Sequence, residues 1–152
     1  MATVVKSDEE WRAQLTPATF KVLRKKATEP RGVTLAKGGF DDMFDEGTWV
    51  CAGCGAALYT HEMKFDCGCG WPGFKANIAG AVREETDADG SRCEVLCKAC
   101  DGHLGHVFRG ERMTPENERH CVNSCSLAFI PEGKTAEDAI RCTYSGSVYG
   151  GD

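Results

Sequence analysis

The sequence lacks any uninterrupted apolar run near the roughly 20 residues that a membrane-spanning helix needs, so no membrane partner is expected. It also lacks a basic excess, because 18 lysines and arginines stand against 23 aspartates and glutamates and the net charge is -5. Nucleic-acid-binding chains usually carry a basic stripe, so nucleic acid is not an expected partner either. The N-terminus has no apolar signal segment and carries Asp8, Glu9 and Glu10, which disfavours secretion.

Cysteine, by contrast, is abundant, with ten in 152 residues. In a small secreted chain this number would indicate a disulfide framework, but no secretory signal is visible. We therefore expect a reducing, cytoplasmic location, where cysteines more often bind metals or carry out redox chemistry. A cleaved upstream presequence stays open as an alternative.

The most specific local motif is a pair of CxxC turns, Cys51/Cys54 and Cys97/Cys100. Two thiolates separated by two residues can bind one metal ion from a tight turn, and four complete the closed shell that structural Zn²⁺ prefers. We therefore predict one structural Zn²⁺ held by these four cysteines. The shell has no open position, so the ion is not expected to be catalytic.

Two other uses of these cysteines stay open. Both pairs could be redox-active CxxC motifs of the thioredoxin type, although the βαβ pattern that accompanies that type is missing. Alternatively, the first pair could bind a metal with His103 and His106, which would leave the second pair without a role.

Helix signals are confined to the N-terminal region. Ser7 and Glu10 form a capping-box pattern before a short helix over 8–15. Thr16-Pro17 then starts a second helical stripe that runs to about Ala27.

From Gly38 onward the chain consists of short β-favouring segments between glycine-rich turns, which predicts short antiparallel strands. The segments are Trp49-Val50, Leu58-Tyr59, Phe65, Ala81-Val82, Glu94-Val95-Leu96, Val107-Phe108 and Leu127-Ala128-Phe129-Ile130, with a turn signal at Asp89-Gly90. We expect one domain over 1–152, with N-terminal helices at 7–28, a zinc-bearing β core at 38–130 and a loosely held tail at 131–152.

Cys121 is the strongest candidate for a reactive thiol. If 119–129 forms one strand, alternation places Arg119, Cys121 and Asn123 on one face. A guanidinium beside a thiol favours the reactive thiolate, and an asparagine side chain can hydrogen-bond a polar substrate group. Taken alone, Cys121 would be expected to be a small buried hydrophobe, which is the commonest fate of a free cysteine.

Three further features support a functional site around Cys121. His103 and His106 could each protonate a leaving oxygen near neutral pH, although each could also be a structural histidine. Trp71, in a turn stiffened by proline, suits an apolar pocket. Cys69 precedes that turn, where a flexible loop could bring it to Cys121.

Together these motifs closely resemble those of the B-type methionine sulfoxide reductases, which reduce the R epimer of methionine sulfoxide in proteins. The matching segments are Glu10-Trp11-Arg12-x-Gln14-Leu15-Thr16-Pro17, Cys51-x₂-Cys54, Gly68-Cys69-Gly70-Trp71-Pro72, Cys97-x₂-Cys100, His103-Leu104-Gly105-His106-Val107-Phe108 and Arg119-x-Cys121-Val122-Asn123-Ser124-x-Ser126-Leu127-x-Phe129. They occur in order between about residues 10 and 130, which is more specific than any one motif.

The resemblance implies a mainly β fold, a β-tent of two antiparallel sheets preceded by short helices, with a structural zinc opposite the active site. It implies that Cys121 attacks the sulfoxide and becomes a sulfenic acid. Cys69 matches a resolving cysteine that some members carry, which would form a disulfide that thioredoxin or a similar dithiol reduces. The expected partners are oxidised proteins and that reductant, and a monomer is expected.

The remaining site residues also follow from the resemblance. His103 and His106 would act on the sulfoxide oxygen; the residues expected to bind substrate are Trp71, Asn123, Arg119 and Phe129.

Several positions depart from the family pattern. His120 replaces a customary aromatic residue and could add a proton-active group near Cys121. Gly73 replaces a commoner serine or alanine, and the stretch Arg109-Gly110-Glu111 differs from the usual loop. Cys67 is a rival resolving thiol, whereas no role is apparent for Cys93, Cys125 and Cys142.

Two other functions use the same features. A zinc-dependent binding module on the same scaffold would leave Cys121 unreactive. A cytosolic redox sensor would use Cys67 and Cys69 as a CxC pair and would need no substrate pocket.

Overall fold

Two short helices precede the sheets, and both begin where their capping signals predict. Helix α1 (Asp8–Gln14) starts after Ser7, whose hydroxyl accepts a hydrogen bond from the Glu10 backbone N–H while the Glu10 carboxylate accepts one from Ser7 N–H. Helix α2 (Pro17–Lys25) starts on a proline and ends at Lys26, whose φ of 60° is left-handed. Among the described residues, 2–87 and 90–150, no helix is long and apolar enough to cross a membrane.

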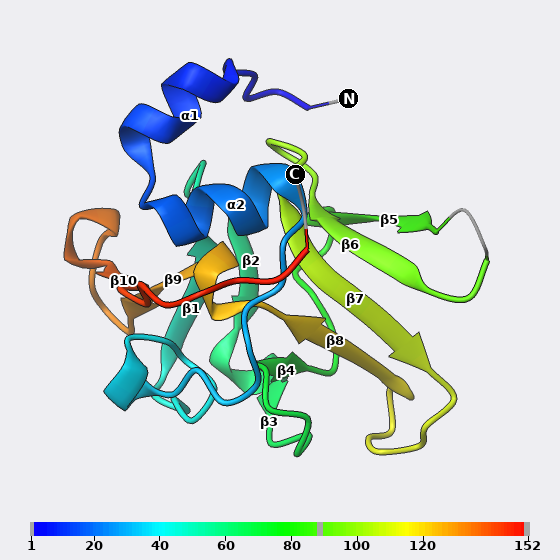
Figure 1. Ribbon diagram of the computed structural model, residues 1–152. Coiled ribbons are helices and arrows are strands. Elements are labelled where there is room, and N and C mark those ends of the chain that lie inside the picture. Colours follow the sequence, from blue (N-terminus) through cyan, green and yellow to red (C-terminus); the bar gives the residue numbers. More distant parts are fainter. Residues whose placement is uncertain (1, 88–89, 151–152) are drawn as a thin grey trace.

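The computed structural model confirms the mainly β fold with two antiparallel sheets (Figure 1). The strands are β1 (Gly47–Cys51), β2 (Ala57–Thr60), β3 (Lys64–Phe65), β4 (Gly73–Phe74), β5 (Val82–Thr86), β6 (Cys93–Cys97), β7 (His103–Arg109), β8 (Glu118–Val122), β9 (Leu127–Pro131) and β10 (Ile140–Arg141). One sheet has the order β10-β9-β1-β2 and the other β3-β4-β8-β7-β6-β5. Of the predicted turn Asp89-Gly90, Asp89 lies outside the described residues.

The expected continuous strand over 119–129 is interrupted. Strand β8 ends at Val122, a 3₁₀ turn (Ser124–Ser126) follows, and β9 then joins the other sheet. The turn is stabilised by side chains, because Ser124 Oγ accepts from the Phe40 backbone N–H at 2.9 Å. The chain therefore crosses from one sheet to the other just after Cys121.

Aromatic side chains fill the space between the sheets. The ring centroid of Trp49 on β1 lies 4.5 Å from that of Phe129 and 5.0 Å from that of Phe40. Tyr59 stacks on Phe74 with centroids 4.1 Å apart. All five side chains are buried, and burying each large apolar side chain contributes roughly 1.5–3 kcal/mol.

The C-terminal segment contacts the body of the protein at several places. Strand β10 pairs with β9, Cys142 is buried, and the backbone of Tyr149 exchanges two hydrogen bonds with that of Thr28. Figure 1 shows this segment running back past the C-terminal end of α2. The described part of the expected loose tail is thus packed against both the four-stranded sheet and the segment after α2.

Candidate active site and metal centre

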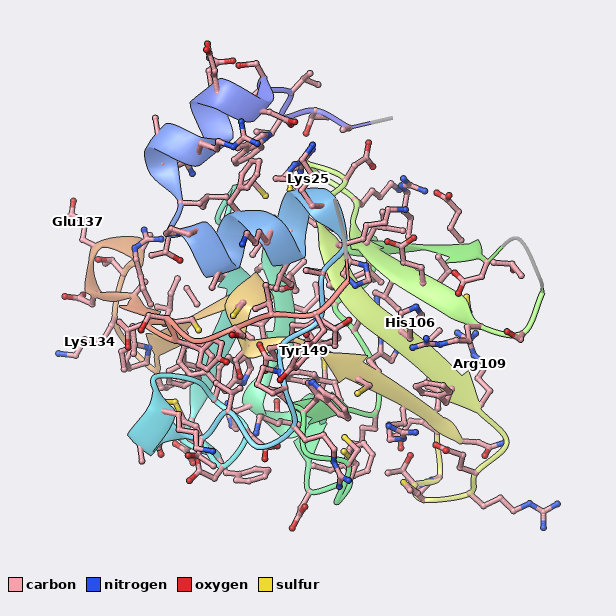
Figure 2. All side chains as sticks on the ribbon, viewed as in Figure 1. Lys25, His106, Arg109, Lys134, Glu137 and Tyr149 are labelled. Carbon is pink, nitrogen blue, oxygen red and sulfur yellow. The ribbon has the colours of Figure 1, made fainter. Side chains whose placement is uncertain are left out.

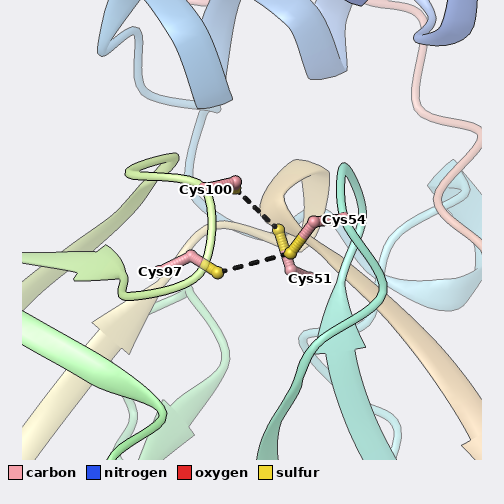
Figure 3. Close-up of side chains that lie close together, drawn as sticks. All are labelled: Cys51, Cys54, Cys97 and Cys100. Carbon is pink, nitrogen blue, oxygen red and sulfur yellow. Dashed lines mark hydrogen bonds between the residues drawn. The ribbon is translucent and has the colours of Figure 1, made fainter. Parts of the chain in front are cut away.

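The two CxxC turns face each other at one end of the two sheets (Figure 3). The four sulfur atoms lie within 4.8 Å of one another, with 3.7 Å between Cys51 and Cys100 and 3.6 Å between Cys54 and Cys97. A tetrahedral ion with metal–sulfur bonds of about 2.3 Å requires sulfur–sulfur distances of about 3.8 Å. The four cysteines are thus positioned to bind one metal ion, and zinc is compatible with their geometry.

This cluster joins the two sheets. The first turn connects β1 to β2 in the four-stranded sheet, and the second connects β6 to β7 in the six-stranded sheet. Helix α2 is attached to it, because Arg24 Nη1 donates to the Cys100 carbonyl oxygen at 2.8 Å. The alternative set with His103 and His106 is not the one that the structure gathers, since the described residues bring the four thiols together instead.

Cys121 and Cys69 meet at a second place, on the six-stranded sheet. Their sulfur atoms are 3.9 Å apart. Cys121 lies on β8, and its backbone pairs with Gly73 on β4, directly after the loop that carries Cys69. Arg31 Nε donates to the Cys69 carbonyl oxygen at 3.1 Å and helps to hold that loop. Strand pairing therefore places the thiols side by side without any loop movement.

The two thiols change each other's ionisation. The hydrogen bond between them raises the pKa of Cys121 and lowers the pKa of Cys69, while burial raises both pKa values. The positive charge of Arg119 lowers both. The raised pKa favours Cys121 as the protonated donor in the hydrogen bond between the two sulfur atoms.

Arg119 is fixed from two sides. Its Nε and Nη2 bind the carboxylate oxygens of Glu111 at 2.8 and 3.0 Å, and its guanidinium carbon lies 4.5 Å from the centroid of the Phe108 ring. Phe108 on β7 is the strand partner of Arg119 on β8. The unusual stretch that contains Glu111 thus supplies the partner of Arg119.

A cavity of about 250 Å³ opens above the thiol pair. Its lining includes six residues predicted from the sequence, which are Cys69, Trp71, His106, Arg119, Cys121 and Asn123. Arg92 and Phe108 also line it, and sequence reasoning missed both. Arg92 belongs to no motif, whereas Phe108 could have been found from its place in the motif that contains both histidines.

The backbone of Glu29 positions two walls of this cavity. Trp71 Nε1 donates to the Glu29 carbonyl oxygen at 3.0 Å, and Glu29 N–H donates to Asn123 Oδ1 at 3.0 Å. Asn123 Nδ2 in turn donates to the Leu104 carbonyl oxygen at 3.0 Å. The indole ring and the amide are therefore locked before any substrate enters.

The two histidines are placed differently. A β-bulge at Leu104 puts His103 and His106 on the same face of β7, with ring centroids 5.6 Å apart. His106, labelled in Figure 2, lines the cavity and is the strand partner on β7 of Cys121 on β8. His103 is buried behind it, with Nδ1 2.7 Å from a carboxylate oxygen of Glu94. Only His106 can touch a molecule in the cavity.

Arg92 sets the protonation of His106. Its Nη2 lies 3.1 Å from His106 Nδ1, and because arginine can only donate, Nδ1 must accept. Burial and the charge of Arg92 lower the pKa of His106. At neutral pH the ring is therefore neutral and carries its proton on Nε2, ready to donate.

Two sequence-based expectations fail here. Phe129 is not brought to the cavity, because it lies on β9 in the aromatic core against Trp49. His120 does not add a proton-active group beside Cys121, because adjacent residues of a strand face opposite sides. His120 is fully buried, 3.1 Å from the Tyr59 hydroxyl and 2.7 Å from Glu118 Oε1.

Glu29 was not singled out by the sequence either, yet it is the most unusual carboxyl group of the site. It is fully buried; its Oε1 accepts from the Cys125 backbone N–H at 2.8 Å. Burial raises the pKa of Glu29 to about 7. The Cys125 and Cys142 sulfur atoms lie 4.0 Å apart in the same buried region.

Comparisons with known proteins agree on one family. A family model described as the SelR domain matches residues 15–131. The chain is 55% identical over 131 residues to peptide methionine sulfoxide reductase B7 of Arabidopsis thaliana, covering 86% of this chain and 88% of the relative. It is 57% identical over 125 residues to reductase B8 of the same plant, covering 82% and 85%. It is 51% identical over 136 residues to the chloroplastic reductase B3 of Oryza sativa subsp. japonica, covering 89% and 58%.

Removing one sulfur ligand should release the metal. We expect Cys97→Ser to lose bound metal and much of its free energy of unfolding, since four-ligand sites contribute roughly 10–16 kcal/mol in apparent terms in zinc-finger peptides. Elemental analysis and thermal unfolding measure both quantities. Cys93→Ser, at the other end of β6, is the matched control and should keep the metal. Equal metal content in the two variants would contradict the four-cysteine site.

Buried Glu29 should make stability depend on pH. Its carboxyl group has a pKa of about 7 in the folded protein and about 4.3 when unfolded. The free energy of unfolding that protonated Glu29 contributes at low pH is therefore lost as the pH rises from about 4.3 to 7, by about 4 kcal/mol, and the loss is complete above that range. Denaturant unfolding of wild type and Glu29→Gln across this range should show a stability difference that changes by that amount. A difference independent of pH would show that folding does not raise the pKa of Glu29.

Proposed function

This chain belongs to the SelR-domain family of peptide methionine sulfoxide reductases B, and we propose that it reduces the R epimer of methionine sulfoxide through a Cys121–Cys69 thiol cycle. Family membership makes it an oxidoreductase that reduces methionine sulfoxide in proteins. The observation that carries the cycle is the 3.9 Å approach of the two sulfur atoms at the base of the cavity.

The cavity suits a sulfoxide with one chirality. A sulfoxide sulfur carries a methyl group, a carbon chain and an oxygen in a pyramid, so the epimers differ in which side presents the oxygen. Trp71 offers an apolar wall for the methyl group, whereas His106 and Asn123 offer hydrogen-bond donors for the oxygen. With the sulfoxide sulfur held over the Cys121 thiol, only one epimer can place its methyl group against Trp71 and its oxygen near His106 and Asn123.

The first step is attack on the sulfoxide sulfur. Cys121 attacks as the thiolate, a form that the positive charge of Arg119 favours, and the proton that Cys121 gives up goes to the sulfoxide oxygen, to which the Nε2–H of neutral His106 donates a hydrogen bond. The oxygen ends on Cys121 as a sulfenic acid, and methionine leaves. His103, held by Glu94, supports the position of His106 and does not touch the substrate.

The second step regenerates the thiols. Cys69 attacks the sulfenic sulfur of Cys121, a disulfide forms and water leaves. A dithiol protein of the thioredoxin type then reduces the disulfide by exchange. Because the thiols are adjacent in the folded protein, disulfide formation requires only a small approach of the two sulfur atoms.

We assign zinc to the four-cysteine cluster, where it would hold the two sheets together. Its chemistry there is structural, since four thiolates leave no coordination position for substrate. We further propose a monomer that acts in the cytoplasm. A thiol cycle requires a reducing compartment, and relatives named chloroplastic make the plastid the alternative location.

A binding module without catalysis is the weaker candidate, because it would not need two adjacent thiols under a cavity with a proton donor. A redox sensor would share the thiols but would leave Trp71 and Asn123 without a reason to be locked around that cavity.

Turnover should depend on Cys121 and on the epimer. With dithiothreitol as reductant, we expect the wild type to reduce the R epimer of a blocked methionine sulfoxide and not the S epimer. Cys121→Ser should lose more than about a thousandfold in rate, because the nucleophile is removed. Chromatographic separation of the products measures both. Turnover that persists in Cys121→Ser would exclude Cys121 as the nucleophile.

Replacing Cys69 should slow turnover with thioredoxin much more than turnover with dithiothreitol. Cys69→Ser cannot form the Cys69–Cys121 disulfide, so turnover with thioredoxin should fall by at least about tenfold. With dithiothreitol, which can reduce the sulfenic acid directly, it should stay within about threefold of wild type. The two rates are compared by NADPH oxidation and by product analysis. Unchanged thioredoxin-dependent turnover would remove the resolving role of Cys69.

A further inference from the structure

A third thiol, that of Cys67, lies beside the proposed pair and has no part in the cycle described so far. Its sulfur donates to the Trp71 carbonyl oxygen at 3.7 Å, and the Cys69 sulfur donates to the same oxygen at 3.2 Å. Because Cys69 is also 3.9 Å from Cys121, three sulfur atoms are gathered where the loop before β4 meets β8.

Cys69 occupies the middle of this group. Its sulfur shares the Trp71 carbonyl oxygen with the Cys67 sulfur on one side and lies 3.9 Å from the Cys121 sulfur on the other. Thiol–disulfide exchange needs an attacking, a central and a leaving sulfur. The structure has the three sulfur atoms in that order.

Gly73 makes the room for Cys67. A Cβ atom at Gly73 would lie 2.6 Å from the Cys67 sulfur and 3.1 Å from its Cβ, so any side chain there would displace the thiol. Gly73 is also the strand partner of Cys121. The same backbone pairing therefore positions the Cys67 thiol and Cys121.

The loop between Cys67 and Cys69 can accommodate a disulfide. Gly68 separates the two cysteines with a left-handed φ of 70°, and its N–H donates to Asp66 Oδ1 at 3.1 Å. Consecutive Cα atoms are 3.8 Å apart, so the bend at Gly68 puts the Cα atoms of Cys67 and Cys69 about 5–7 Å apart. This distance overlaps the 4.4–6.8 Å range found in disulfides. Only the loop from Cys67 to Cys69 would need to change conformation to form this disulfide.

We propose that Cys67 is a second resolving cysteine, which moves the disulfide from Cys69–Cys121 to Cys67–Cys69; this rests on the proposed thiol cycle. The Cys67 thiolate attacks the Cys69 sulfur, the Cys67–Cys69 bond forms, and the Cys69–Cys121 bond breaks. The electron pair of the broken bond leaves with Cys121, which takes up the proton that Cys67 lost. The exchange changes no net oxidation state, and an external dithiol then reduces the Cys67–Cys69 disulfide.

This transfer has a consequence for the cavity. Cys69 and Cys121 line it, whereas Cys67 is absent from its lining. The oxidised pair therefore moves toward the loop while Cys121 becomes a free thiol again. The enzyme can reduce a second sulfoxide before it meets the reductant, and reductant and substrate need not compete for Cys121.

The test is the amount of methionine formed without any reductant. The fully reduced wild type, with its metal bound, is mixed with excess blocked methionine-R-sulfoxide. We expect about two equivalents of product per chain, the second leaving a sulfenic acid on Cys121 that dimedone labels. Cys67→Ser should form one equivalent and retain a Cys69–Cys121 disulfide, with little dimedone label. Mass spectrometry of the digested protein locates the disulfide and the label.

Two further variants complete the design. Gly73→Ala keeps the Cys67 thiol but displaces it, so its yield should fall toward one equivalent. Cys93→Ser removes a cysteine on β6 that hydrogen-bonds Glu84 at 3.3 Å, far from this loop in the sheet order, and should still form two equivalents.

The outcomes separate the two proposals. No product from folded wild type would overturn the proposed function itself. One equivalent from wild type, with a Cys69–Cys121 disulfide, would overturn the role of Cys67 and leave the cycle intact. Two equivalents from both wild type and Cys67→Ser would also overturn it, since some other thiol would then accept the oxidation.

Discussion

The pairing of β4 and β7 with β8 is the constraint on which the candidate site depends. Cys121 on β8 lies opposite His106 on one side and Gly73 on the other. The first pairing puts a proton donor beside the thiol. The second brings the loop with Cys69 to a sulfur–sulfur distance of 3.9 Å. A slip of one residue would turn Cys121 to the opposite face, because side chains alternate along a strand, and the thiol would then occupy the buried position of His120.

Two anchors hold that sheet in place. The four-cysteine cluster ties the β6–β7 turn to the β1–β2 turn of the other sheet, so the start of β7 is fixed close to His103. Glu29 is the second anchor, since its backbone binds Trp71 and Asn123 and its carboxylate binds the turn after β8. A carboxyl group buried this completely is costly when ionised, and its raised pKa reflects that cost. The placement of the cavity walls is thus built into the fold before substrate arrives.

The departures from the family pattern acquire physical roles in this structure. Glu111 neutralises and orients Arg119 beside the thiols. Gly73 leaves space that the Cys67 sulfur fills. His120 packs edge-on to Tyr59, as an aromatic side chain would, with ring centroids 5.6 Å apart.

The sequence by itself determined the features that depend on short spacings: the capped helices, most of the strands, the metal-ligating pairs and six of the residues around the cavity. Spacing suffices there because a turn or a cap is made by residues close in the chain. Only the tertiary structure decided that His106 and not His103 faces the cavity, that Phe129 lies in the core, and that Glu29 and Arg92 belong to the site. A one-residue bulge, a chain crossing between sheets and the register of non-adjacent strands set those positions, and none of them leaves a local pattern in the sequence.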